Sequence, residues 1–101
     1  MRSKLTEEAA AALLAARPGW LQDEGDSRWI SKRYRFGSFP EAVAFVGEVA
    51  RIAEEEEHHP LIAIDYKVVT LRLTTWSAGG LTRLDFTVAE RFDEAFAVMR
   101  P

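Results

Sequence analysis

The spacing of apolar residues along the chain switches between the period of a helix and that of a strand. Apolar residues recur every three or four positions at about 6–17, 38–59 and 82–99, which predicts three helices. Apolar and polar residues alternate at about 20–22, 29–36 and 66–75, which predicts strands, and residues 63–65 fit a short strand or an irregular approach. Helices laid on one face of an antiparallel sheet would bury these apolar stripes together, so the pattern predicts an α+β fold.

Local capping signals define the ends of the second helix most clearly. Ser38 stands three residues before Glu41, a capping box in which the hydroxyl and the carboxylate satisfy free backbone N–H groups, with Pro40 in the first turn. The helix should end near His59, because the residue before Pro60 is disfavoured in the α conformation. Further caps and stops are expected at Thr6, Pro18-Gly19 and Thr82.

The composition narrows the class of protein. At 101 residues the chain is long enough for one core, and we expect a single domain over residues 1–101. A formal charge of −3 argues against general nucleic-acid binding, which needs a basic face. There is no cysteine, which excludes disulfides and thiolate metal sites. The alanine-rich run 9–16 is too short to cross a bilayer, so we expect a soluble cytoplasmic protein with no membrane partner.

The only two histidines of the chain are adjacent, at His58 and His59, and Pro60 follows them. Histidine is favourable at a helix C-terminus, where its charged form opposes the negative end of the helix dipole. A pair fixed by proline equally fits an acid/base site, because histidine exchanges protons near neutrality, with an unperturbed pKa of about 6.5. Helical phase places His59 on the extension of the buried stripe and His58 about 100° away, so one imidazole is expected over the sheet and the other near solvent.

Four glutamates, Glu54 to Glu57, precede the histidines. As a solvated charge run they oppose the helix dipole and need no function. Glu54, however, lies four residues before His58 on the same helix face, where its carboxylate would favour the imidazolium and orient the ring. A metal site is disfavoured, because adjacent side chains at a helix end diverge and no third histidine or any cysteine completes a zinc site.

Trp76 and Asp85 gain significance from their distance to the histidines. Alone, Trp76 is an aromatic residue at the end of a strand, and Asp85 is an acid in the first turn of a helix. The spaced set resembles the motif of the pterin-4a-carbinolamine dehydratases: Glu54-x-x-x-His58-His59-Pro60, then Tyr66, Trp76 and Asp85. The similarity extends along the chain through Leu5-Thr6-x-Glu8, Pro18-Gly19-Trp20 and Phe36 to Phe45. It implies an α+β fold with three helices packed on one face of a four-stranded antiparallel sheet.

The resemblance also implies an activity. Family members remove water from a 4a-hydroxytetrahydropterin to give the quinonoid dihydropterin, which recycles the pterin cofactor of aromatic amino-acid hydroxylases. They need no metal and no organic cofactor. They pair as homodimers or homotetramers through sheet and helix contacts, and no direct binding of nucleic acid is implied.

The implied site combines proton transfer with a flat pocket. His58 would exchange protons at the 4a-hydroxyl, His59 would hold and polarise the ring, and Glu54 would set the charge of His58. A flat bicycle suits aromatic and apolar walls. The other implied site residues are Pro60, Trp20 and the backbone near Thr75 as walls of the pocket, Trp76 as a substrate-binding residue, and Asp85 as a support at the site entrance or helix start.

One position departs from the commonest form of the motif. Many members have a third histidine, which assists as a second acid, where this chain has Trp76. The departure leaves open a second class of function, a dehydratase-like module that binds a partner in protein assembly or acts as a dimerisation cofactor of a transcription factor. The intact run of Glu54, His58, His59 and Pro60 favours catalysis.

Overall fold

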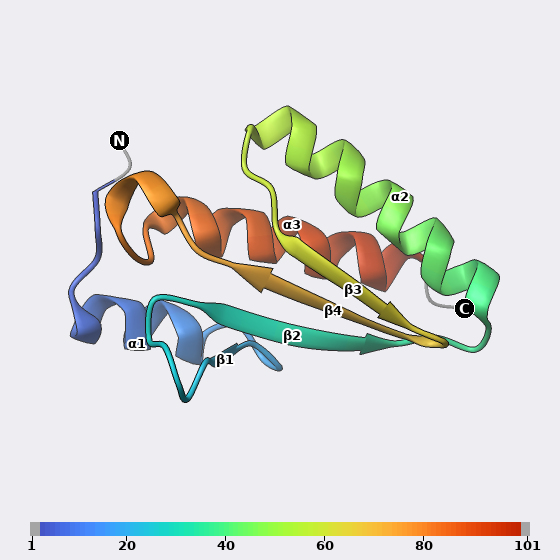
Figure 1. The fold of residues 1–101 in the computed structure, drawn as a ribbon, viewed down its shortest axis with the longest axis horizontal. Helices are drawn as coiled ribbons and strands as arrows, with labels where there is room; N and C mark the ends of the chain where they lie inside the picture. Colours follow the sequence, from blue (N-terminus) through green and yellow to red (C-terminus); the bar gives the residue numbers. More distant parts are fainter. Residues whose placement is uncertain (1–2, 100–101) are drawn as a thin grey trace.

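A computed structural model of the chain describes residues 3–99, in which a four-stranded antiparallel sheet is packed against helices (Figure 1). The strands are β1 (Leu21–Gln22), β2 (Ile30–Arg35), β3 (Leu61–Asp65) and β4 (Val68–Leu73), in the spatial order β1-β2-β4-β3. The helices are α1 (Glu7–Ala15), α2 (Phe39–Glu56) and α3 (Arg83–Met99), and a short 3-10 helix, η1 (Trp76–Ala78), links β4 to α3. The predicted α+β fold, with three helices and a four-stranded antiparallel sheet, is confirmed.

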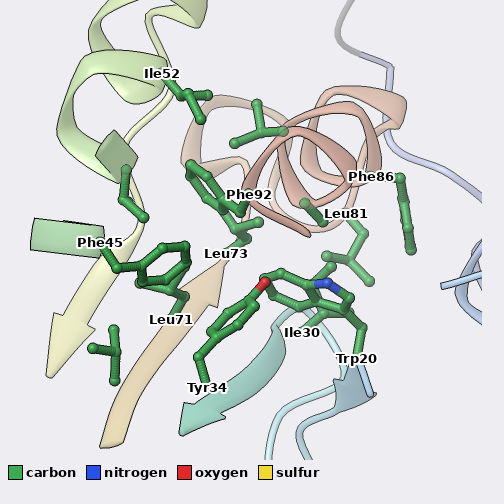
Figure 2. Close-up of a cluster of buried hydrophobic side chains, with 14 of the residues drawn as sticks. Trp20, Ile30, Tyr34, Phe45, Ile52, Leu71, Leu73, Leu81, Phe86 and Phe92 are labelled. Carbon is green, nitrogen blue, oxygen red and sulfur yellow. The ribbon is translucent and has the colours of Figure 1, made fainter. Parts of the chain in front are cut away.

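One face of the sheet and the helices enclose the core (Figure 2). Ile30 and Tyr34 of β2 and alternate residues of β4 point into it, as the period of two in the sequence predicts. Phe45 of α2 and Phe92 of α3 cover these strands, and both are fully buried. The opposite face of β2 carries charged side chains such as Arg33, which is exposed. Burial of the apolar stripes, more than helix propensity, holds the helices on the sheet.

The predicted capping box forms at the start of α2, with one variation. Ser38 Oγ accepts a hydrogen bond from the backbone N–H of Glu41 (3.3 Å). The Glu41 carboxylate accepts from the N–H of Gly37 (3.0 Å), one residue before the cap. The cap of α1 is also present, since Thr6 Oγ1 accepts from the N–H of Ala9 (3.1 Å). Both helices therefore begin where the sequence predicts.

The end of α2 lies earlier than predicted, at Glu56 instead of near His59. Glu57 adopts the left-handed conformation (φ 51°), which reverses the direction of the chain. The N–H of His58 then closes the helix by donating to the carbonyl of Ala53 (3.0 Å). Proline constrains only the residue directly before it, so Pro60 limits how far the helix can run and does not fix its last residue.

The strand predicted at 66–75 is shorter than expected, and the uncertain strand at 63–65 is longer. β3 and β4 form an antiparallel hairpin in which Asp65 lies opposite Val68. Tyr66 occupies the two-residue turn with φ 54°, and its side chain is exposed. Because short hairpin turns require positive φ, Tyr66 is drawn out of the strand in which its aromatic ring suggested it would lie.

Candidate active site

The reversal at Glu57 sends the two histidines in opposite directions. His58 is 7% exposed and contacts α3, whereas the side chain of His59 is 61% exposed. Helical phase predicted that His59 would continue the buried stripe, and this prediction was wrong. The helix ends before either residue, so its periodicity no longer determines where their side chains point.

A buried chain of hydrogen bonds holds His58 from behind. Its Nε2 lies 2.7 Å from Oδ1 of Asp85, which is fully buried in the first turn of α3. The other carboxylate oxygen, Oδ2, accepts from the hydroxyl of Thr75 (2.8 Å) and from the backbone N–H of Thr82 (2.9 Å). Since the Thr75 hydroxyl uses its proton on Asp85, the Thr82 hydroxyl, 2.9 Å away, donates to Thr75. The Asp85 carboxylate therefore has the hydrogen bonds that a buried charge requires.

The bond to Asp85 also determines which ring nitrogen of His58 is open. Within residues 3–99, no buried side-chain nitrogen or oxygen lacks a hydrogen-bond partner. Nδ1 of His58 has no hydrogen-bond partner among residues 3–99, so this atom reaches the surface, where His58 lines a pocket. With Asp85 ionised, Nε2 carries a hydrogen and donates it to the carboxylate. Nδ1 is then the ring nitrogen that is not used in the bond to Asp85.

Glu54 pairs with His59 and not with His58. Its Oε2 lies 2.6 Å from Nε2 of His59, and both side chains are exposed. The prediction that Glu54 would orient His58 was therefore wrong. A spacing of four residues brings side chains together only while the helix continues, and α2 ends between them. The carboxylate that orients His58 comes instead from Asp85, 27 residues further along the chain.

A pocket of about 360 Å³ opens beside the histidines, a size typical of small-molecule sites. It lies between the turn that follows α2 and the segment that follows β4. Its lining residues are Glu57, His58, His59, Thr74, Thr75, Trp76 and Ser77. Four of the residues expected in the site, His58, His59, Thr75 and Trp76, are thus brought together in one place.

Three other expected site residues occupy different positions. Trp20 lies in the core, where its indole N–H donates to Asp93 of α3 (3.1 Å), and it adjoins β1, at the sheet edge opposite β3. The expectation that Trp20 walls the pocket was wrong, because its large ring is better buried in the core with its N–H paired. Pro60 is half-buried and is not among the residues that line the pocket. Asp85 stands at the helix start, behind His58, and not at the entrance.

Trp76 borders the pocket with a side chain that is 76% exposed. Its ring meets that of Trp29 edge to face, with ring centroids 5.2 Å apart and planes at 82°. Sequence reasoning gave Trp29 no role beyond the start of a strand. The alternation of residues along the strand could have singled out Trp29. It lies on the same strand face as Ser31 and Arg33, so it is an apolar residue on a polar face.

The described side chains contain no group suited to a metal ion. In the described part of the chain, no three histidine, cysteine, aspartate or glutamate residues are grouped so that they could hold a metal ion. His58 and His59 contact different carboxylates, on opposite sides of the turn. No helix among residues 3–99 is long and apolar enough to cross a membrane.

A second groove, also of about 360 Å³, runs between α2 and α3. Arg51 in its wall pairs with Glu48, also in the wall, and Arg91 pairs with Glu55 of α2. It contains no histidine. Of these two hollows of equal volume, the pocket beside His58 is the one lined by imidazole groups.

Comparisons with known proteins point to one family. The model of the pterin 4 alpha carbinolamine dehydratase family matches residues 3–95. A protein of Chloroflexus aurantiacus that is provisionally named pterin-4-alpha-carbinolamine dehydratase is 45% identical over 91 residues, which are 90% of this chain and 95% of that protein. A protein of Thermomicrobium roseum with the same provisional name is 44% identical over 92 residues, 91% of this chain and 96% of the relative.

Two solved structures share the fold. A transcriptional coactivator/pterin dehydratase from Brucella melitensis aligns with a TM-score of 0.87 and 31% identity, over 92% of this chain and 98% of that one. A pterin dehydratase-like protein, identified as a RuBisCO assembly factor in the alpha-carboxysome, aligns with a TM-score of 0.66 and 26% identity, over 77% and 89% of the two chains. The resemblance inferred from the spaced motif is confirmed: the chain belongs to the pterin 4 alpha carbinolamine dehydratase family.

Proposed function

We propose that the protein dehydrates a 4a-hydroxytetrahydropterin to the quinonoid dihydropterin, with His58 as proton donor and acceptor. One observation carries the proposal: His58 is anchored at Nε2 on a buried carboxylate and open at Nδ1 beside a pocket bordered by an indole. Membership of the family supports the substrate class. The reaction recycles the pterin cofactor of aromatic amino-acid hydroxylases, and it uses neither a metal nor an organic cofactor.

The reaction needs one proton delivered and one proton removed. The bond between C4a and the hydroxyl oxygen breaks, and protonation of that oxygen lets it leave as water. Loss of the proton from the adjacent ring N–H lets that electron pair form the new C=N bond. A His58 imidazolium gives the first proton from Nδ1, and the neutral ring then accepts the second, so His58 ends as it began. Such general acid–base help is worth about 10²–10⁴-fold in rate.

Asp85 acts through His58 as a positioning residue. Its carboxylate holds a hydrogen on Nε2, so the ring presents Nδ1 to the substrate in every cycle. The negative charge also stabilises the imidazolium that gives the proton. Thr75 and Thr82 hold the carboxylate in place, and Thr75 thereby supports the acid/base group as well as bordering the pocket.

His59 and Trp76 are assigned to binding. His59 stands on the pocket rim with Glu54 beside it, where a cationic or polar ring can hold the polar edge of the pterin. The exposed indole of Trp76 provides a flat apolar surface for the bicycle. The role of His59 does not require a fixed tautomer, which matches the exposure of its side chain.

The decisive experiment generates the 4a-carbinolamine with an aromatic amino-acid hydroxylase and follows its decay by ultraviolet absorbance. Wild type should accelerate the decay, and His58→Ala should lose about 100-fold or more of kcat. His59→Ala is the matched control, because it removes an imidazole from the same pocket without touching the buried pair. It should raise KM and change kcat by less than His58→Ala does.

Two outcomes would refute this assignment. A wild-type rate no faster than buffer would end the dehydratase proposal. A fast rate that persists in His58→Ala would instead remove that residue from the acid/base role and leave the reaction in place.

A second candidate function is binding without turnover. The fold matches a pterin dehydratase-like protein that was identified as a RuBisCO assembly factor, and Trp76 replaces the third histidine of many family members. In that case the carbinolamine would decay at the buffer rate in the assay above. The intact buried pair of His58 and Asp85 favours the dehydratase over this candidate.

We further propose that the protein assembles through β3. This strand forms one edge of the sheet, and all five of its residues are exposed, among them Leu61 (49%), Ile62 (40%) and Ile64 (39%). An apolar edge strand is ready to pair with another strand, here that of a second copy in a homodimer or a homotetramer. Light scattering should show an oligomer that Ala63→Lys dissociates and that Ala12→Lys, at an exposed position of α1, leaves intact. An unchanged mass in Ala63→Lys would exclude this interface.

A further inference from the structure

Trp76 presents a large indole beside the pocket, and its local backbone does little to restrain it. Trp76 is the first residue of the three-residue helix η1. Two glycines follow this helix, Gly79, which is in the left-handed region (φ 74°), and Gly80. Exposed side chains change rotamer on the picosecond to nanosecond timescale. The direction of this indole therefore depends on the contacts that it makes with other parts of the fold.

Trp29 is the side chain against which Trp76 stands. The two rings meet edge to face at 5.2 Å, a favourable arrangement for aromatic pairs. The two residues differ sharply in exposure, since Trp29 is 8% exposed and Trp76 is 76% exposed. The buried ring is the fixed member of the pair, and the exposed ring is the one that it orients.

Trp29 is held in turn by a charged pair on the sheet face that the helices leave open. The guanidinium carbon of Arg72, on β4, lies 4.6 Å from the centroid of the Trp29 ring, within cation–π distance. Arg72 Nη2 also lies 2.9 Å from Oδ2 of Asp23, in the loop between β1 and β2. Asp23, Arg72, Trp29 and Trp76 thus form a continuous row that leads from this loop to the pocket.

Trp76 separates two hollows. The pocket beside His58 and a smaller hollow of about 80 Å³ both have Thr74 and Trp76 in their walls. Trp29 belongs to the wall of the smaller hollow only. Removal of its ring would enlarge the smaller hollow and give the indole of Trp76 room to turn away from the pocket.

We infer that Trp29 is a positioning residue which, with Arg72, fixes the indole of Trp76 as the wall against which the substrate ring stacks. The inference rests on the proposed function and deepens it. A wall that is ordered in advance spares the loss of side-chain freedom on binding, which improves affinity. It leaves proton transfer at His58 unchanged, so Trp29 acts on KM and on the Kd of a bound pterin more than on kcat.

A double-mutant cycle tests this, with Trp29→Leu, Trp76→Leu and the double variant. Dehydration is measured with the enzymatically generated carbinolamine. Binding is measured by calorimetry with 7,8-dihydrobiopterin, which lacks the 4a-hydroxyl and is not turned over. Trp29→Leu should raise KM and Kd about fivefold and change kcat less than twofold. Once Trp76 is replaced, Trp29→Leu should add less than a twofold loss, because its effect passes through that indole.

A milder pair of variants keeps the test valid if Trp29→Leu does not fold. Arg72→Gln removes the cation from the Trp29 ring and leaves both indoles present. Its matched control is Arg33→Gln, an exposed arginine on the same sheet face. Arg72→Gln should raise Kd and weaken the coupled circular-dichroism signal of the two indoles, whereas Arg33→Gln should change neither.

Three results separate the inference from the proposed function. Wild-type Kd in both Trp29→Leu and Arg72→Gln would overturn the role of Trp29. Losses from Trp29→Leu and Trp76→Leu that add in full would also overturn it. A wild type that binds the dihydropterin without dehydrating the carbinolamine would end the proposed function, and the binding cycle would still decide whether Trp29 orients Trp76.

Discussion

His58 and His59 are neighbours in the chain and differ in almost every physical respect. His58 is 7% exposed and is paired with a fully buried carboxylate from α3. The side chain of His59 is 61% exposed and is paired with Glu54, from the helix that precedes it. One left-handed residue, Glu57, produces the difference by turning the chain between the helix and the pair. Adjacent histidines of one motif therefore differ in burial and in carboxylate partner.

The two histidine–carboxylate pairs suit different tasks. In the buried pair, water does not screen the interaction, and each oxygen of Asp85 accepts at least one hydrogen bond. This pair can hold one tautomer and one ring direction, as proton transfer demands. The exposed pair is screened by solvent and contributes little to stability. It can adjust to a ligand.

We expect the largest effect from Asp85→Asn, which removes the carboxylate of the buried pair. An amide in place of the carboxylate can donate to Nε2 of His58, which would favour the wrong tautomer and leave the imidazolium without its counter-charge. We expect kcat in the carbinolamine assay to fall about 100-fold or more. The free energy of unfolding, measured in urea, should fall by about 1–3 kcal/mol.

Asp93→Asn is the control for that loss. Asp93 also lies on α3 and accepts hydrogen bonds from three side chains, Trp20, Lys32 and Tyr34, but it is outside the pocket. It should lower stability by a similar amount and leave kcat within about threefold. Equal losses of kcat in Asp85→Asn and Asp93→Asn would mean that Asp85 acts only on stability.

The turn that precedes the two histidines is tested by replacing Glu57 with valine and with glycine. Glycine adopts the left-handed conformation without strain, whereas a β-branched residue does not. Glu57→Val should therefore be less stable in urea unfolding than Glu57→Gly, by about 1–2 kcal/mol. It should also have the lower kcat, because the buried pair depends on this turn. Equal stability of the two variants would show that the left-handed turn does not hold the site.

Glu54→Gln tests the assignment of carboxylates to rings. The NMR signals of the His59 imidazole should shift, and those of His58 should not, because the Glu54 carboxylate is hydrogen-bonded to His59 and the His58 ring is bonded to Asp85. We expect kcat to change less than about threefold, since the pair is exposed. A shift confined to the His58 signals would restore the pairing that helical spacing predicted and contradict the structure.

The smallest effect is expected at a surface pair, Asp26 and Arg28. The side-chain hydrogen bond from Arg28 lowers the pKa of Asp26 from 3.8 to about 2. A carboxyl group whose pKa is lower in the folded state stabilises the protein above about pH 4 and loses that contribution as the pH falls toward 2. Urea unfolding of Asp26→Asn should differ slightly from wild type at neutral pH and not at pH 2. A difference that grows as the pH falls would contradict this sign.

The fold could be predicted where one segment contains all the relevant information. Ser38 and Glu41 are three residues apart and cap a helix whatever the rest of the chain does. The alternation in β4 is visible in six residues, and it sorted the buried from the half-buried positions. The errors occurred at ends, at Glu57 and Tyr66, where a left-handed residue that is not glycine gives no signal in the sequence.

The site could be predicted only in part. The spaced motif grouped His58, His59 and Trp76 in one site, and these three residues do line one pocket. It did not reveal that Asp85 holds His58, because the two lie on different elements and meet through packing. Thr82 was expected as a simple helix cap, yet its hydroxyl binds Thr75 and its N–H binds Asp85. Trp20, which follows a turn marked by proline and glycine, was expected in the wall of the pocket and lies in the core.

The sequence by itself determined the elements, the α+β class and the family, because periodicity, caps and a spaced motif are properties of local order along the chain. Only the tertiary structure shows which carboxylate pairs with which histidine and that Trp29 packs against Trp76. The physical reason is that a hydrogen bond between side chains depends on distance and direction in space. These are set by the angle at which elements meet, and in this protein by the backbone conformation of a single residue, Glu57.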